Sequence, residues 1–93
     1  MIGRRLEDRT ASEILPPNAR PGDYWRWRRK RSQPWHWYVL VPSGDIGGLR
    51  QHQVTEHEDG TITVSPSILV RGGPGMSEER WHGFLERGVW RSV

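Results

Sequence analysis

Ser67 and His82 are the two residues whose chemistry best suits a catalytic role in this 93-residue chain. A serine hydroxyl is a weak nucleophile at neutral pH, and it becomes reactive when a neighbouring base accepts its proton. The two residues stand at either end of a glycine-rich connection, residues 71–80, which can bring its ends together. The sequence therefore offers a serine–histidine pair. In the alternative interpretation, Ser67 only caps a turn after Pro66 and His82 is an ordinary half-buried ring.

A catalytic histidine also needs a third group that orients its ring. The segment H-Q-V-T-E-H-E-D, residues 52–59, supplies polar candidates, and we assign this role to His57 or Glu56. The same segment, together with His82, could instead hold a zinc ion. In a continuous strand, however, His52 and Glu56 point to one side and His57 to the other. A solvent-facing hairpin is the simpler interpretation, so we assign no metal and no cofactor.

A second group of side chains, which could bind a ligand, lies in a basic, tryptophan-rich stretch. Six basic residues face the single acid Asp23 within positions 20–31. Arginines between aromatic side chains can contact phosphate and stack on bases, at roughly 1–3 kcal/mol per stacked base. As an alternative function we therefore expect a non-catalytic module that binds a nucleotide, nucleic acid or host protein, unless the basic run is merely a solvated loop. The predicted ligand contacts are Trp25, Arg26, Arg28, Arg29, Trp35 and Trp37.

The composition of the chain limits which kinds of site it can hold and indicates its cellular compartment. The chain has no cysteine, which excludes a disulfide framework and any thiolate site and favours a reducing compartment. The start M-I-G-R-R-L-E-D-R has no apolar run behind its arginines, so we expect neither a signal peptide nor contact with a membrane. We therefore expect a soluble intracellular protein.

The stretch H-Q-V-T-E-H-E-D-G-T-I-T-V-S-P-S-I-L, with the later W-H-G-F-L-E-R-G-V-W, closely resembles a family of small proteins encoded by phages of actinobacteria, over residues 22–93. Some members are labelled ammonia monooxygenase, for which this cysteine-free chain gives no support. More distantly, residues 52–90 resemble the peptidase-like proteins that accompany bacterial ubiquitin-like conjugation operons. Those share a P-S-I element, a spacer and then a histidine. Matched by motif, their serine falls on Ser67 and their histidine on His82.

The resemblance implies a phage accessory protein in the cytoplasm of the infected host cell. It implies a peptide or isopeptide bond as the substrate and a host or ubiquitin-like protein as the partner. As a binding module, the same protein would antagonise host defence. The cysteines that are common in the bacterial relatives are absent here.

Short strands, in which residues that face the core alternate with residues that face solvent, are predicted to position these residues. Alternation over residues 22–28 and 35–41 predicts a hairpin with a basic tip. Residues 42–48 are predicted to form a loop, and residues 49–57 an irregular lead into a strand with Val54 as its core residue. Glu58-Asp59-Gly60 is typical of a hairpin turn.

The strand after that turn, T-I-T-V-S, should place Ile62 and Val64 in the core and end at Pro66, which cannot donate a ladder hydrogen bond. A last hairpin over residues 81–93 is predicted, with Phe84 and Trp90 as its anchors.

We expect one β-rich domain over residues 22–93, preceded by an N-terminal arm over residues 1–21. The predicted fold is mostly β with little helix. It is a small antiparallel meander of about six or seven strands that forms a compact sandwich or a partly open barrel.

Overall fold

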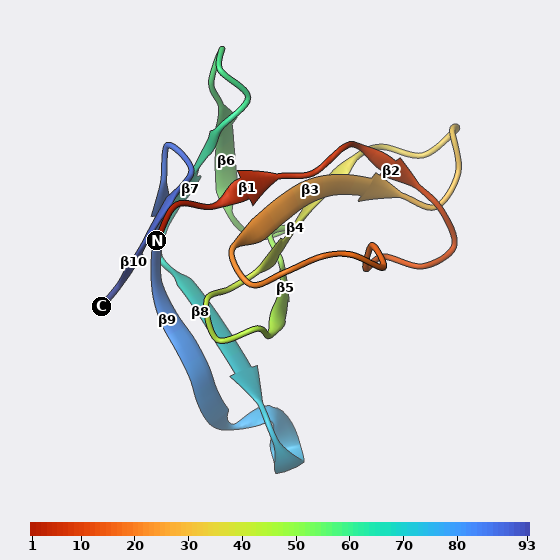
Figure 1. Cartoon of the computed structure of the whole chain (residues 1–93). Coiled ribbons are helices and arrows are strands. Elements are labelled where there is room, and N and C mark those ends of the chain that lie inside the picture. Colours follow the sequence, from red (N-terminus) through yellow and green to blue (C-terminus); the bar gives the residue numbers. More distant parts are fainter.

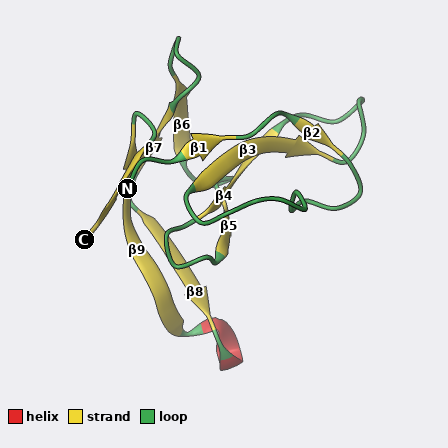
Figure 2. Ribbon diagram, in the orientation of Figure 1, coloured by secondary structure: helices red, strands yellow, loops and turns green.

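Ten short strands in three sheets make up nearly all the regular structure of the computed structural model, which describes residues 1–93 (Figure 1). The strands are β1 (Arg4–Arg5), β2 (Arg9–Thr10), β3 (Asp23–Arg28), β4 (His36–Leu40), β5 (Ile46–Gly48), β6 (Gln53–Glu56), β7 (Ile62–Ser65), β8 (Ile68–Gly72), β9 (Glu78–Glu86) and β10 (Val89–Ser92). One 3-10 turn, η1 (Pro74–Met76), is the only helical element (Figure 2). The chain forms no helix that could span a lipid bilayer. The prediction of a mostly β chain with little helix is confirmed.

The predicted basic hairpin forms the centre of the largest sheet. β3 and β4 pair antiparallel, with Trp25 opposite Tyr38 and Trp27 opposite His36. β5 adds to the other side of β4, so part of the predicted loop over residues 42–48 is a short edge strand. Two of its three residues are glycines, which carry no side chains whose alternation could have indicated a strand.

The predicted N-terminal arm lies along the open edge of β3. β1 and β2 both pair with β3 in parallel, so two short pieces of the 1–21 segment belong to the same sheet. The main-chain carbonyls of Ile14 and Ala11 accept hydrogen bonds from the indole N–H groups of Trp25 (3.1 Å) and Trp27 (2.9 Å). These carbonyls give each indole the partner that a buried polar N–H group needs.

Both faces of the β3–β4 hairpin are buried. On one face, Tyr24 and Val39 belong to a cluster of ten buried residues that also includes residues of β7, β8, β9 and β10. On the other face, a cluster of three buried residues holds Trp25 and Trp27, and the partly buried Ile14 packs against it. Since successive residues of a strand point to opposite faces, β3 contributes to both clusters.

Two predicted core positions are corrected by the structure. Val54 is only partly buried, whereas Leu49 is 3% exposed and is the true core residue of its segment. Phe84 is half-buried, whereas its neighbour Leu85 is fully buried. Adjacent strand residues face opposite sides, so only one of the two can enter the core. The predicted inward positions of Ile62, Val64 and Trp90 are confirmed.

A pair of substitutions tests the corrected core. Leu85→Ala should lower the free energy of unfolding by about 2–5 kcal/mol, because it removes a fully buried side chain and leaves a cavity. Phe84→Ala should cost clearly less, although the residue removed is larger. Urea unfolding followed by tryptophan fluorescence measures both values. A larger loss in Phe84→Ala would show that the corrected core assignment is wrong.

Candidate functional site

Ser67 lies at a corner between two strands. β7 ends at Ser65, and β8 begins at Ile68, after Pro66 has interrupted the ladder as predicted. β8 then pairs antiparallel with β9, with Ile68 opposite Gly83 and Leu69 opposite His82. Strand alternation therefore brings Ser67 and His82 to the same side of the β8–β9 pair.

The side chains of Ser67 and His82 meet at this corner. Ser67 Oγ lies 2.9 Å from His82 Nε2, which is a hydrogen-bond distance. Both residues are half-buried. The ring of His82 makes no other hydrogen bond within the chain. The Ser67–His82 pair therefore has the geometry that nucleophile activation requires, but no third residue is hydrogen-bonded to the imidazole.

His52 is the histidine of the 52–59 segment that reaches the corner. Its Nε2 lies 3.1 Å from the main-chain oxygen of Ser67. Because a carbonyl oxygen can only accept, His52 Nε2 must carry the proton of this hydrogen bond. The other ring nitrogen, Nδ1, is buried without a hydrogen-bond partner. The register of β6 with β7 explains this placement, because Gln53 pairs with Ser65 at the corner.

Glu56 and His57, the predicted orienting groups, lie at the other end of β6. Glu56 pairs with Ile62, three residues beyond the Gln53–Ser65 pair and so about 10 Å further along the ladder. The His57 ring bonds to Thr63 Oγ1 at 2.7 Å. The structure thus brings together Ser67, His82 and His52, and gives Glu56 and His57 other partners.

The three histidines discussed for zinc therefore have separate hydrogen-bond partners. His52 bonds to the main chain of Ser67, His57 to Thr63, and His82 to the hydroxyl of Ser67. No group of three or more His, Asp and Glu side chains has a metal-binding arrangement. The zinc alternative gains no support from this geometry.

Arginine side chains lie over the tryptophan rings at positions 35 and 37. The Arg28 guanidinium carbon lies 4.0 Å from the centre of the Trp35 ring, and the Arg26 carbon lies 5.2 Å from the same ring. The Arg5 carbon lies 5.0 Å from the Trp37 ring. Each is within the range of a cation–π contact. The tryptophans at positions 35 and 37 are therefore covered by the chain's own arginines.

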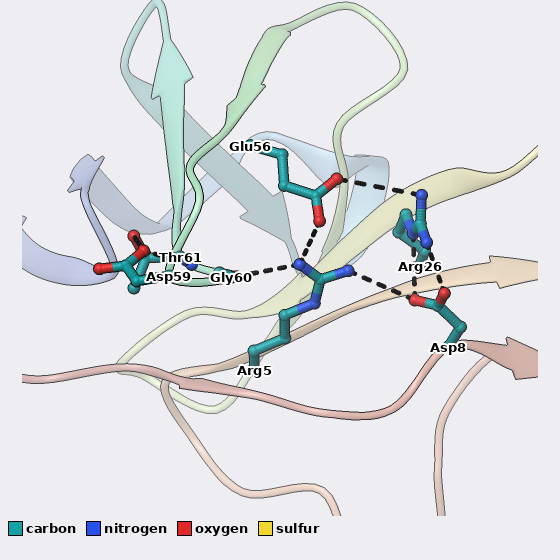
Figure 3. A network of polar contacts seen from close by, with 7 residues as sticks. All are labelled: Arg5, Asp8, Arg26, Glu56, Asp59, Gly60 and Thr61. Carbon is teal, nitrogen blue, oxygen red and sulfur yellow. Dashed lines mark hydrogen bonds and ion pairs between the residues drawn. The ribbon is translucent and has the colours of Figure 1, made fainter.

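Two of these arginines belong to a charge network of Arg5, Asp8, Arg26 and Glu56 (Figure 3). Arg26 Nε donates to Asp8 at 3.0 Å, and Arg5 pairs with Glu56 and donates to the carbonyl of Gly60 at 3.0 Å. The hydrogen bond from Arg26 lowers the pKa of Asp8 and raises the pKa of Arg26. Figure 3 also shows Asp59, whose pKa is lowered by hydrogen bonds from Thr61 in the predicted turn.

The six predicted ligand contacts therefore differ in availability. Trp25 is fully buried and has no surface for a ligand. Arg26 is already paired with Asp8. Arg28 and Arg29 have no carboxylate partner among the ion pairs of the chain. Any anion that binds to the hairpin must therefore use the arginines nearest its tip.

No protein-family model matches the chain, and no curated protein or solved structure is significantly similar to it. The resemblance of its motifs to the phage and peptidase-like families stays a prediction.

The charge network predicts a specific dependence of stability on pH. The pKa of Asp8 is below its ordinary value of 3.8 in the folded chain, so the stability from this pairing is present above that pH. It is lost as the pH falls through the lowered value. Asp8→Asn should therefore cost about 1 kcal/mol or less at pH 7, with a difference from the parent chain that shrinks on acidification below about pH 4.

Urea unfolding at several pH values measures this difference. Glu7→Gln is the matched control, because Glu7 is exposed and forms no ion pair. A cost of Asp8→Asn that stayed constant from pH 7 to pH 3 would contradict the predicted coupling.

Proposed function

We propose that the protein is a hydrolase in which Ser67 is the nucleophile and His82 is the general base. The observation that carries the proposal is the separation of 2.9 Å between Ser67 Oγ and His82 Nε2. A serine and a histidine are the residue types that nucleophilic catalysis of this kind needs. Their contact joins residues 15 positions apart in the chain.

The proposed reaction is an acyl transfer. His82 Nε2 takes the hydroxyl proton as Ser67 Oγ attacks the carbonyl carbon of a peptide or isopeptide bond. The protonated ring then gives that proton to the leaving amine as the carbon–nitrogen bond breaks. In the second half, His82 takes a proton from water, which attacks the acyl–serine ester and releases the acid. The proton returns to Ser67.

His52 acts as a positioning residue in this proposal. Its hydrogen bond to the main-chain oxygen of Ser67 fixes the corner that carries the nucleophile. No residue performs the orienting role for His82, and disrupting that role in a serine protease triad lowers kcat by roughly 10⁴-fold. We therefore expect slow turnover, and the proposal is best tested by covalent trapping.

The substrate class and setting are part of the same proposal. The resemblance of residues 52–90 to peptidase-like proteins of ubiquitin-like conjugation operons favours a peptide or isopeptide bond in a host or ubiquitin-like protein. The resemblance of residues 22–93 to phage proteins favours action in the cytoplasm of an infected cell.

A fluorophosphonate probe tests the nucleophile. The probe should label Ser67, as located by peptide mass spectrometry, and Ser67→Ala should abolish labelling. Ser65→Ala is the matched control, because Ser65 is an exposed serine at the same corner and should not affect labelling. His82→Gln should slow labelling at least 100-fold, since a general base contributes roughly 10²- to 10⁴-fold.

His57→Gln and Glu56→Gln should leave the labelling rate unchanged, because neither residue is hydrogen-bonded to His82. If the probe leaves Ser67 unmodified, or labels it equally fast in His82→Gln, the contact is only structural and the hydrolase proposal fails.

A further inference from the structure

A cleft beside the tip of the β3–β4 hairpin contains no acidic residue. Its volume is about 370 Å³. It is lined by Trp27, Arg28, Arg29, Gln33, Pro34, His36 and Arg50. We call it the tip cleft. Three arginines, a histidine and a glutamine in one concave site form a set of hydrogen-bond donors suited to an anion.

The sheet register explains how distant residues come together in the tip cleft. Trp27 lies opposite His36 in the β3–β4 pair. On the other side of β4, the main-chain N–H of Leu49 donates to the carbonyl of Trp37 at 3.1 Å. Arg50 follows Leu49 and thus comes level with His36. No local sequence pattern marks Arg50 or His36, because only this register brings them beside the basic tip.

The arginines of the tip cleft lack counter-charges. Arg28, Arg29 and Arg50 have no carboxylate within 4.0 Å, and neither do Lys30 and Arg31 in the adjoining turn. Arg5 and Arg26, by contrast, are neutralised in the charge network. Like charges held close together repel one another, and a bound anion would relieve that repulsion.

Arg28 is held in place by groups that carry no negative charge. Its guanidinium lies against the Trp35 ring, its Nε donates to Thr10 Oγ1 at 3.0 Å, and its Nη1 donates to the carbonyl of Arg31 at 3.2 Å. Two of the five guanidinium N–H groups are used in this way, which leaves three for a ligand. A cation that is already positioned loses less conformational entropy on binding.

We propose that the tip cleft binds phosphate esters, through Arg28, Arg29 and Arg50. The donors suit the phosphate of a nucleotide or of a nucleic-acid strand, and Lys30 and Arg31 extend the basic surface beyond the cleft. This is a second function on the same chain. The cleft lies at the tip of the β3–β4 hairpin, whereas the Ser67–His82 pair lies at the corner between β7 and β8.

Fluorescence anisotropy with a labelled single-stranded dT 20-mer tests the proposal. Binding through three arginines should give a slope of about −2 in log affinity against log salt concentration. Arg29→Ala and Arg50→Ala should each weaken binding about tenfold. Both side chains are exposed and make no hydrogen bond within the chain, although the Arg29 guanidinium carbon lies 5.9 Å from the centre of the Trp27 ring. Arg50→Ala should therefore unfold at the same urea concentration as the parent, and Arg29→Ala should lose at most the small contribution of an exposed cation–π contact.

Arg71→Ala is the charge-matched control. Arg71 is an exposed arginine of β8, and the β8–β9 hairpin extends away from the tip of the β3–β4 hairpin (Figure 1). This variant should bind the oligonucleotide as the parent does.

Competition with ATP distinguishes the two phosphate sources. Displacement of the oligonucleotide by ATP assigns the tip cleft to nucleotides, and failure of ATP to compete assigns it to a phosphodiester backbone. Undetectable binding at 50 mM salt, or equal losses in Arg50→Ala and Arg71→Ala, would overturn the proposal. Fluorophosphonate labelling of Ser67 should be unchanged in Arg29→Ala and Arg50→Ala, so the two proposals can fail separately.

Discussion

Burial of both faces of the β3–β4 hairpin is the constraint on which the rest of the structure depends. Only 33% of the residues are hydrophobic. The large aromatic side chains of this one hairpin therefore supply buried surface to two clusters, one on each of its faces. Tyr24 joins the C-terminal strands on one face, and Trp25 and Trp27 are covered by the N-terminal segment on the other. Each indole also needs a carbonyl, which the N-terminal segment supplies. The N-terminal segment and the C-terminal strands therefore pack on opposite faces of this hairpin.

The arginines along the same hairpin differ in whether a carboxylate neutralises them. Towards its middle, Arg26 and the neighbouring Arg5 are balanced by Asp8 and Glu56, and both arginines lie over the Trp37 ring. At the tip, Arg28 is fixed by an aromatic ring and by neutral oxygens alone. Uncompensated positive charge is expected where it serves an interaction, because it otherwise only opposes the compact state. The proposed phosphate site follows from this contrast.

Sequence patterns predicted local features well and register poorly. The turn at Asp59–Gly60, the strand end at Pro66 and the inward positions of Ile62 and Val64 follow from residue type and alternation, which are local properties. The meeting of Ser67 and His82 was also predicted, because a short connection joins the two residues. Which histidine of residues 52–59 would reach the corner depends on the β6–β7 register, which no local pattern specifies.

The proposed hydrolase chemistry requires His82 to accept the proton of Ser67, so the position of the proton on the His82 ring decides whether that chemistry is possible. A nitrogen-15 NMR spectrum of the imidazole, recorded at a pH where the ring is neutral, shows which nitrogen carries the proton. We expect a proton on Nδ1 and a free lone pair on Nε2, which faces Ser67 Oγ at 2.9 Å. A proton on Nε2 would mean that the ring donates to the hydroxyl, and it would contradict the role of His82 as the base.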